Sequence, residues 1–251
     1  MEEQVQRLVD KTWAKFQDLT PSRRLLISIS GIPGSGKTTL AANVSNRLNA
    51  LHHASSPACN ATTSIAAFIP MDGYHLSRAQ LSALPDPTTA HARRGAAFTF
   101  DGDSFLHLVH RLREPLTPET LTLYAPSFDH AVKDPVADDI AIGAGIRIVL
   151  FEGNYLTLDR APWNEAARLM DALWFVDVDM DVARRRLVRR HVEAGIAADE
   201  HAARSRVEEN DLVNGEEILA AKVAGIEEVV VSREDEAWMP EAQEKGTAGG
   251  L

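Results

Sequence analysis

One segment, GIPGSGKT at residues 31–38, constrains the fold of this chain more than any other part of its sequence. It follows a short apolar run at residues 25–30, which has the composition of a buried strand, and it precedes apolar positions at helical spacing over residues 38–51. Glycines in such a turn let backbone N–H groups surround phosphate oxygens without clashes from Cβ atoms. A chance glycine-rich turn is the alternative, but the position between a strand and a helix favours a phosphate-binding loop, or P-loop.

The end of this loop carries the predicted chemistry. We expect Lys37 to reach the β- and γ-phosphates of a nucleotide and the Thr38 hydroxyl to bind Mg²⁺. The following helix directs its positive N-terminal end toward the same phosphates. ATP and Mg²⁺ are therefore the expected cofactors. The loop alone does not separate ATP from GTP, or a kinase from a GTPase, a motor ATPase or a transporter ATPase. The predicted nucleotide contacts are Gly31, Gly34, Ser35, Gly36, Lys37, Thr38 and Thr39.

The rest of the chain alternates strand-like and helix-like segments. The predicted strands are residues 65–70, 146–151, 173–178 and 226–232, with a short extended piece at 121–124, and helices are predicted near residues 103–113 and between 180 and 222. This alternation predicts an α/β P-loop NTPase fold, a doubly wound parallel sheet of about five strands with helices on both faces. Residues 52–64 and 85–103 are expected to be mostly loop.

We expect one nucleotide-binding domain, at residues 23–233. Within residues 1–22, the spacing of the apolar residues predicts an amphipathic helix that packs on this domain. An arginine-rich lid is predicted at about residues 181–212, and residues 234–251 are expected to form a flexible tail.

Two carboxylates follow predicted strands, at the edge of the sheet where α/β proteins bind ligands. Asp72, in Met71-Asp72-Gly73, is placed to accept the proton of an attacking hydroxyl and to lie near the metal, although Asp-Gly is also a common turn pair. Glu152 ends an apolar strand downstream of the phosphate loop, where a carboxylate holds Mg²⁺, usually through water. A turn or helix cap is the alternative for Glu152.

The segment RRRLVRRHVEAG at residues 184–195 places five arginines on one predicted helix of an acidic chain. Arg186 and Arg189 are three residues apart and share a face, so they are candidates to neutralise charge on a transferred phosphoryl group. A solvated face that pairs with acidic residues is the alternative. Further along, Asn210, Asp211 and Asn214 either contact an adenine or cap a helix, and the sequence does not separate these roles.

Composition excludes several classes of protein. The net charge of −10 argues against nucleic-acid binding through the overall field. No apolar stretch approaches the roughly 18 residues of a membrane span, and no signal-peptide pattern is present, so we expect no membrane partner. Cys59 is the only cysteine, which excludes an internal disulfide and fits a cytoplasmic location. A homo-oligomer is left open.

Taken in order, these motifs resemble the family of P-loop small-molecule kinases that contains uridine kinase, phosphoribulokinase and type I pantothenate kinase. The resemblance covers about residues 25–232 and is carried by GIPGSGKTT, MDGYH, RRGAAFTFDGDSF, FEGNYL and RRRLVRRHVEAG. It implies that Asp72 is the general base, that Glu152 lies near Mg²⁺ and the acceptor, and that Asp101 holds acceptor hydroxyls. It also implies that Arg186 and Arg189 contact ATP phosphates.

The resemblance implies an acceptor site on the other side of Asp72. Arg94 and Gly95 are similar to an Arg/Lys-Gly pair before the acceptor loop of pantothenate kinases. Phe128-Asp129-His130 with Lys133 lies where uridine kinases carry a Tyr-Asp segment followed by a basic residue. Phe128 replaces a tyrosine of that segment, and Asp72-Gly73-Tyr74 differs from the usual Asp-Ser-Phe-Tyr. The predicted substrate residues are Asp101, Arg94, Tyr74, His75, Tyr124, His130 and Lys133.

The sequence therefore predicts in-line phosphoryl transfer from MgATP to a hydroxyl of a small molecule, such as a nucleoside, a pantothenate-like compound or a sugar. Lys37, Asp72, Arg186 and Arg189 are the predicted catalytic residues. One alternative is a nucleoside monophosphate kinase, which predicts more arginines in the acceptor loop than Arg93 and Arg94. The other is a nucleotide-dependent switch protein, which predicts slow ATP hydrolysis and no phosphorylated product. The acceptor itself is not identified.

Overall fold

The computed structural model describes residues 1–55 and 64–233 and is built around a five-stranded parallel sheet. The strand order is β2 (Ala66–Pro70), β5 (Ile148–Gly153), β1 (Leu25–Gly31), β6 (Ala172–Asp177) and β7 (Glu228–Val231). The central strands β1 and β5 are buried at every position, as expected where helices cover both faces of a parallel sheet. The predicted doubly wound sheet of about five strands is therefore confirmed.

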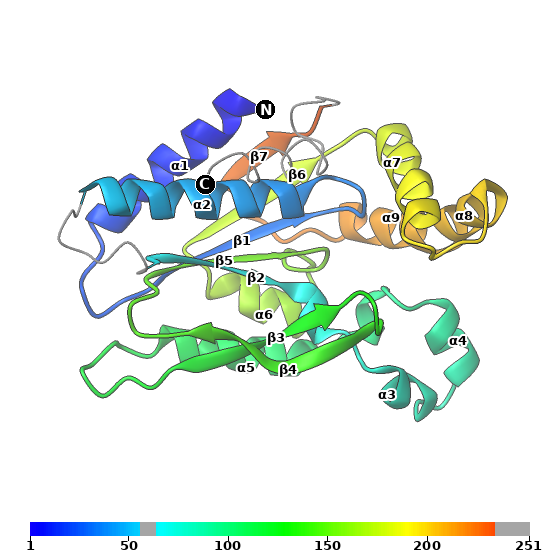
Figure 1. Ribbon diagram of the computed structural model, residues 1–251, viewed down its shortest axis with the longest axis horizontal. Helices are drawn as coiled ribbons and strands as arrows, with labels where there is room; N and C mark the ends of the chain where they lie inside the picture. The colour runs from blue at the N-terminus through cyan, green and yellow to red at the C-terminus, as the bar shows by residue number, and fades with distance from the viewer. Residues whose placement is uncertain (56–63, 234–251) are drawn as a thin grey trace.

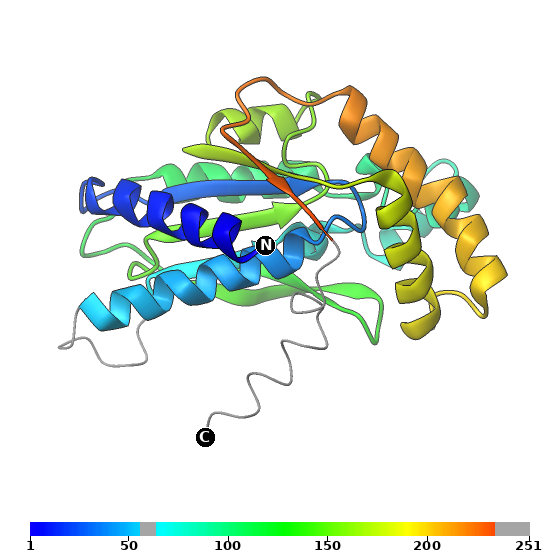
Figure 2. The ribbon, with the colours of Figure 1, turned by 90° about the horizontal axis from the view of Figure 1, so that it is seen from above.

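Helices pack on both faces of the sheet (Figures 1 and 2). On one face, α1 (Glu2–Gln17) and α2 (Lys37–Ser55) share a core with β1, in which Leu8, Leu40 and Ile27 are fully or almost fully buried. On the other face, α5 (Gly102–Arg113) and α6 (Trp163–Arg168) join a second core through Phe105 and Trp163. The two cores thus pack on opposite faces of the sheet, and the carboxyl ends of its strands form the edge where α/β proteins bind ligands.

The helix α1 is tied to the edge strand β7 by a buried carboxylate. Glu228 is only 4% exposed and accepts hydrogen bonds from Arg7 and Lys11 of α1. The Gln4 side-chain amide donates to the Val231 carbonyl at 3.0 Å and accepts from the Val231 N–H at 2.9 Å. These contacts cover the free edge of the sheet with the amino-terminal helix.

A two-stranded antiparallel hairpin, β3 (Leu123–Asp129) and β4 (Asp134–Ile142), lies beside the main sheet. The sequence predicted only a short extended piece at 121–124, because acidic residues on the exposed face of β4 hide its strand pattern. Short helices also occupy the predicted loop at 85–103: α4 (Pro87–Ala92), capped by Asp86, and a 3₁₀ turn at Ala97–Thr99. The helix α2 extends through Ser55 into the predicted loop at 52–64. Residues 56–63 and the predicted tail at 234–251 lie outside the described residues.

The arginine-rich segment folds into α7 (Met180–Glu193), α8 (Glu200–Arg206), a π-helical turn (Val207–Asp211) and α9 (Leu212–Ala220). These helices lie at the same end of the molecule as α3 (Arg78–Ser82) and α4 (Figures 1 and 2). That end carries the carboxyl ends of the parallel strands, where the phosphate loop begins. Within the described ranges, no helix has both the length and the apolar character to cross a bilayer.

Candidate active site

The phosphate loop follows β1 and leads directly into α2. Gly34 and Gly36 have φ angles of 78° and 88°, a backbone region that disfavours side chains with a Cβ atom. A Cβ at Gly34 would also lie 2.9 Å from the Ala183 carbonyl oxygen, because α7 packs against the loop. The geometry therefore explains why glycine occupies both positions, and it brings the arginine helix into contact with the loop.

Lys37 and Glu152 form a buried pair at the base of this loop. The Lys37 Nζ atom lies 3.8 Å from a Glu152 carboxylate oxygen, and the two residues are 9% and 6% exposed. Burial raises the pKa of Glu152 to about 7, although the nearby Lys37 charge and a hydrogen bond from Thr38 oppose this shift. Burial also lowers the pKa of the Lys37 ammonium. Thus two residues predicted to act on phosphate and metal are brought together, and Thr38 hydrogen-bonds one of them, Glu152.

Asp72 follows the strand that neighbours the strand of Glu152. The parallel register pairs Pro70 of β2 with Glu152 of β5, and Asp72 follows in a 3₁₀ turn at Met71–Tyr74. Its carboxylate is 54% exposed and interacts electrostatically with both Lys37 and Glu152. Gly73 packs so closely on the Pro126 carbonyl of β3 that a Cβ atom would not fit. The hairpin therefore fixes the turn that carries Asp72, with an accessible carboxylate beside the buried pair.

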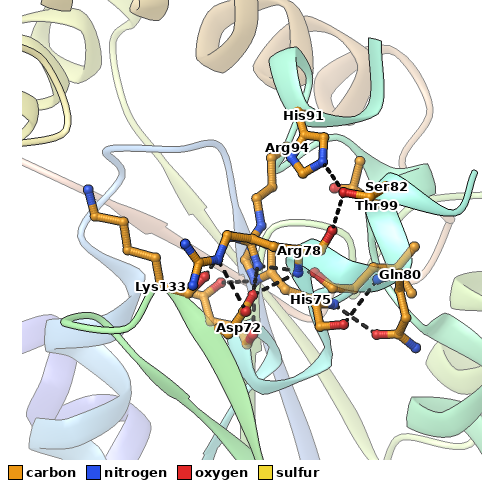
Figure 3. A network of polar contacts seen from close by, with 12 residues as sticks. Asp72, His75, Arg78, Gln80, Ser82, His91, Arg94, Thr99 and Lys133 are labelled. Atoms are coloured by element: carbon orange, nitrogen blue, oxygen red, sulfur yellow. Dashed lines mark hydrogen bonds and ion pairs between the residues drawn. The ribbon is translucent and has the colours of Figure 1, made fainter. Parts of the chain in front are cut away.

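His75 extends the site away from the phosphate loop (Figure 3). Its Nδ1 atom lies 2.8 Å from the Asp72 carbonyl oxygen, which assigns the proton to Nδ1 and leaves Nε2 as an acceptor. The ring lies between Phe100, at a centroid distance of 4.0 Å, and Phe128, at 5.0 Å. Burial lowers the pKa of His75, so the imidazole is neutral at physiological pH.

Arg94, in the loop that follows α4, contacts Lys133 at the tip of the hairpin (Figure 3). The Arg94 Nη2 atom lies 2.8 Å from an Asp134 carboxylate oxygen, and Nη1 donates to the Lys133 carbonyl at 2.6 Å. Arg78 also pairs with Asp134, at 3.3 Å. Arg94, predicted to contact substrate, is therefore held in a structural ion pair beside the site.

The remaining predicted substrate residues occupy three kinds of position. Asp101 caps α5 and accepts from the Ser104 N–H and hydroxyl, at 2.9 and 2.7 Å. Tyr74 is buried in the core with its ring edge against Phe105, so it supports the Asp72 turn from within the domain. The other three lie on the hairpin: Tyr124 and His130 are exposed, and Lys133 is at its tip with a φ of 61°.

The arginines of α7 differ in what they contact. Arg186 donates from Nη1 to the Gly34 carbonyl at 3.2 Å and to the Ser232 hydroxyl at 2.9 Å, so it lies against the phosphate loop. Arg189 forms an ion pair with Glu193 at 2.7 Å and is 54% exposed. Arg190, one helical turn after Arg186, acts electrostatically on the Lys37–Glu152 pair. Arg190 was not among the residues predicted from the sequence, although its i, i+4 spacing from Arg186 was a signal.

A second set of contacts that the sequence did not predict joins the π-helical turn and α9 to the loop that follows α4. Arg93 donates to the side-chain oxygens of Asn210 and Asn214, at 2.9 and 2.7 Å. These asparagines are buried, and neither alternative predicted for them, adenine contact or helix capping, includes this contact. No periodicity in one sequence indicates a polar contact between segments more than one hundred residues apart.

Comparison with known proteins places this site in a family. The sequence model described as "Phosphoribulokinase / Uridine kinase family" matches residues 26–214. The chain belongs to this family.

The chain is 58% identical to the ATP-dependent kinase-like protein notR′ of Aspergillus versicolor over 149 residues, 59% of this chain and 87% of the relative. It is 42% identical over 196 residues to a Schizosaccharomyces pombe protein provisionally named a uridine kinase, with 78% of each chain covered. The structure is similar to crystalline YFH7 from Saccharomyces cerevisiae, with a TM-score of 0.80, 23% identity and coverage of 92% of this chain and 99% of the other.

The family resemblance predicted from the motifs is thus confirmed, and the protein is a P-loop kinase that uses ATP. The side chains around the loop also fit Mg²⁺, which prefers oxygen ligands and usually takes few from the protein. Thr38 supplies a hydroxyl that already hydrogen-bonds Glu152, and Glu152 and Asp72 supply two interacting carboxylates. Nowhere in residues 1–55 and 64–233 do three or more His, Cys, Asp or Glu side chains cluster as a complete protein-made metal site.

Proposed function

We propose that this kinase transfers the γ-phosphoryl group of ATP to a hydroxyl of a small molecule, with Asp72 as the general base. The observation that carries the proposal is the position of Asp72, an accessible carboxylate electrostatically coupled to the buried Lys37–Glu152 pair. A base must be reachable by the acceptor and adjacent to the transferred phosphate. The exposure of the Asp72 side chain supports the first condition, and its electrostatic interaction with Lys37 and Glu152 supports the second.

Other residues around the phosphate loop have proposed roles in binding the phosphates and the metal. Lys37 is positioned to bind the β- and γ-phosphates, and Arg186 to neutralise charge that develops during transfer, a role that we also propose for Arg189. Thr38 and Glu152, with Asp72 nearby, would hold Mg²⁺, which supplies charge neutralisation on the phosphate oxygens when bound. Glu152 must be ionised to bind a cation. Metal binding therefore favours the charged carboxylate, whereas burial favours the neutral form and raises the pKa.

The acceptor side offers polar contacts for a hydroxylated molecule. The Nε2 atom of His75 accepts hydrogen bonds, since Nδ1 donates to the Asp72 carbonyl, and the flanking Phe100 ring gives the site an apolar wall. We propose that Asp101, His130, Lys133 and Tyr124 contribute further contacts from the α5 cap and the hairpin.

A nucleoside monophosphate kinase fits this site less well. It would need free arginines to hold an acceptor phosphate. In the described part of the chain, however, Arg94 is paired with Asp134 and Arg93 with two buried asparagines. Arg78, the other arginine near the hairpin, is also paired with Asp134.

One screen tests the proposal against both alternatives. The purified protein is incubated with MgATP and separate panels of nucleosides, sugars, hydroxy acids and nucleoside monophosphates, and ADP release and product mass are measured. The proposal predicts at least one alcohol that gains a phosphoryl group in proportion to ADP. A phosphorylated monophosphate would instead indicate the alternative kinase class, and ADP release without any phosphorylated product would indicate a switch protein.

A further inference from the structure

The π-helical turn and α9 touch three separate parts of the site. The first contact is with the loop that follows α4, where Arg93 donates from Nε to Asn210 Oδ1 at 2.9 Å and from Nη2 to Asn214 Oδ1 at 2.7 Å. Asn210 Nδ2 returns a hydrogen bond to the Arg94 carbonyl at 3.0 Å. These three hydrogen bonds join the loop that follows α4 to the π-helical turn and α9.

The second contact is with the phosphate loop, and the third is with the arginine helix. Gly215, next to Asn214, lies so close to the phosphate loop that an added Cβ would be 3.5 Å from Ile32 Cβ. Asp211, next to Asn210, accepts a hydrogen bond from His191 Nε2 of α7 at 2.8 Å. Thus adjacent residues on one helical segment face the acceptor loop, the phosphate loop and α7.

The contact of Arg93 with the two asparagines depends on the planar geometry of its guanidinium group. Asn210 and Asn214 are 4% and 1% exposed, and each offers an amide oxygen, which accepts a hydrogen bond without neutralising charge. No carboxylate of residues 1–55 or 64–233 forms an ion pair with Arg93. The planar guanidinium meets two acceptors at once, a geometry that the single ammonium of lysine does not reproduce. The π turn, which re-phases the helix by one residue, lets neighbouring side chains face different partners.

From these contacts we infer that Arg93 is a positioning residue that couples nucleotide binding to the acceptor loop. Nucleotide in the phosphate loop fixes Ile32, Ile32 packs on α9, and α9 holds Arg93 and therefore the loop that leads to Gly95 and Phe100. Tyr155 supports the same loop, since its hydroxyl donates to the Gly95 carbonyl at 2.7 Å. This inference rests on the proposed function only in requiring that the phosphate loop binds nucleotide.

Hydrogen–deuterium exchange of the full chain tests the coupling without a known acceptor. The probe is the non-hydrolysable analogue AMPPNP with Mg²⁺. In the unaltered protein we expect slower exchange over residues 31–38, and slower exchange by about fivefold or more over residues 92–100, the scale of ordinary coupling energies. In Arg93→Gln and Arg93→Lys we expect protection of residues 31–38 to remain and protection of residues 92–100 to be lost.

The matched control is Arg160→Gln, because Arg160 also bonds α9, through Glu217 at 2.6 Å, but on the outer surface. Its exchange should match that of the unaltered protein. If the unaltered protein shows protection at 31–38 and none at 92–100, the coupling is refuted whatever the variants do. If either Arg93 variant keeps full protection at 92–100, the assignment to Arg93 is refuted. A complete absence of protection at 31–38 would instead contradict nucleotide binding and the proposed function itself.

Discussion

The Lys37 ammonium lies 3.8 Å from the Glu152 carboxylate, and both side chains are almost completely buried. Such a pair is costly to bury, since each charge loses its hydration, and it is retained here at the point where phosphate and metal are expected. Burial raises the pKa of Glu152 and lowers that of Lys37. Without nucleotide and metal, burial therefore favours the neutral form of both side chains. A bound nucleotide and cation would add a phosphate beside Lys37 and a metal ion beside Glu152, and each would favour the charged form of its neighbour.

The first prediction follows from the raised pKa of Glu152. Its pKa is about 7 in the folded protein against 4.5 in the unfolded chain, so the folded state binds more protons between these values and stability falls as pH rises through them. The shift corresponds to about 3 kcal/mol as an upper limit. Glu152→Gln removes this cost, so its gain in unfolding free energy over the unaltered protein should be larger at pH 8 than at pH 5. Denaturant unfolding without nucleotide measures it, and an equal difference at both pH values would contradict the assignment.

The second prediction concerns Lys37. Lys37→Met removes the charge expected at the β- and γ-phosphates and leaves Glu152 without its buried partner. We expect kcat to fall by on the order of 100-fold or more, since the charge is required most where negative charge accumulates in the transition state. Steady-state kinetics with an acceptor found by the screen measures this. Turnover within a few-fold of normal would show that Lys37 does not contact the transferred group.

The third prediction compares two arginines on the same helix. Arg186 contacts the Gly34 carbonyl of the phosphate loop, whereas Arg189 is paired with Glu193 on an exposed surface. Arg186→Gln should therefore lower kcat by about tenfold or more, and by more than Arg189→Gln does. The comparison is made at saturating ATP with both variants folded to the same extent. An effect of Arg189→Gln equal to or larger than that of Arg186→Gln would mean that the lid rearranges before transfer.

The fourth prediction concerns the tie between α1 and β7. Burial alone would raise the pKa of Glu228, but the hydrogen bonds and charges of Lys11 and Arg7 outweigh it and hold the pKa below 4.5. The stabilisation is therefore present above the unfolded value of 4.5 and is lost as pH falls through the lower folded value. Glu228→Gln should cost about 1–2 kcal/mol of unfolding free energy at pH 7.

Urea unfolding of this variant and the unaltered protein at pH 7 and at successively lower pH tests that sign. The difference between them should shrink toward acid. Glu227→Gln is a matched control, because Glu227 pairs with Lys15 of the same helix at 2.7 Å but is 39% exposed. A cost for Glu227→Gln as large as that for Glu228→Gln would show that burial of the carboxylate is not the cause.

The sequence predicted the sheet and the position of the phosphate loop well, for a physical reason. Buried parallel strands are short apolar runs, and the glycines of the phosphate loop are required by local backbone geometry, so both leave a local pattern. Asp72 and Glu152 could be placed together because Asp72 comes shortly after β2 and Glu152 lies near the end of β5, and neighbouring parallel strands end at the same edge.

The acceptor half was less predictable, because its contacts join distant segments. The β4 strand carries acidic residues rather than an apolar alternation, and Arg93 meets Asn210 and Asn214 across more than one hundred residues. The orientation of the Tyr74 side chain was also not predictable from the sequence. It stands in a motif beside Asp72, yet its side chain points into the core, because a 3₁₀ turn sends adjacent residues to different sides.

The base assignment to Asp72 is the central claim, and one measurement addresses it most directly. Asp72→Asn keeps the shape of the side chain but loses the proton acceptor, and Asp103→Asn is the control, since Asp103 is an exposed carboxylate on the first turn of α5. With MgATP and an acceptor from the screen, we expect Asp72→Asn to lower kcat by about 100-fold or more while AMPPNP affinity changes little. Asp103→Asn should behave as the unaltered protein. Full activity of Asp72→Asn on that acceptor would contradict the account.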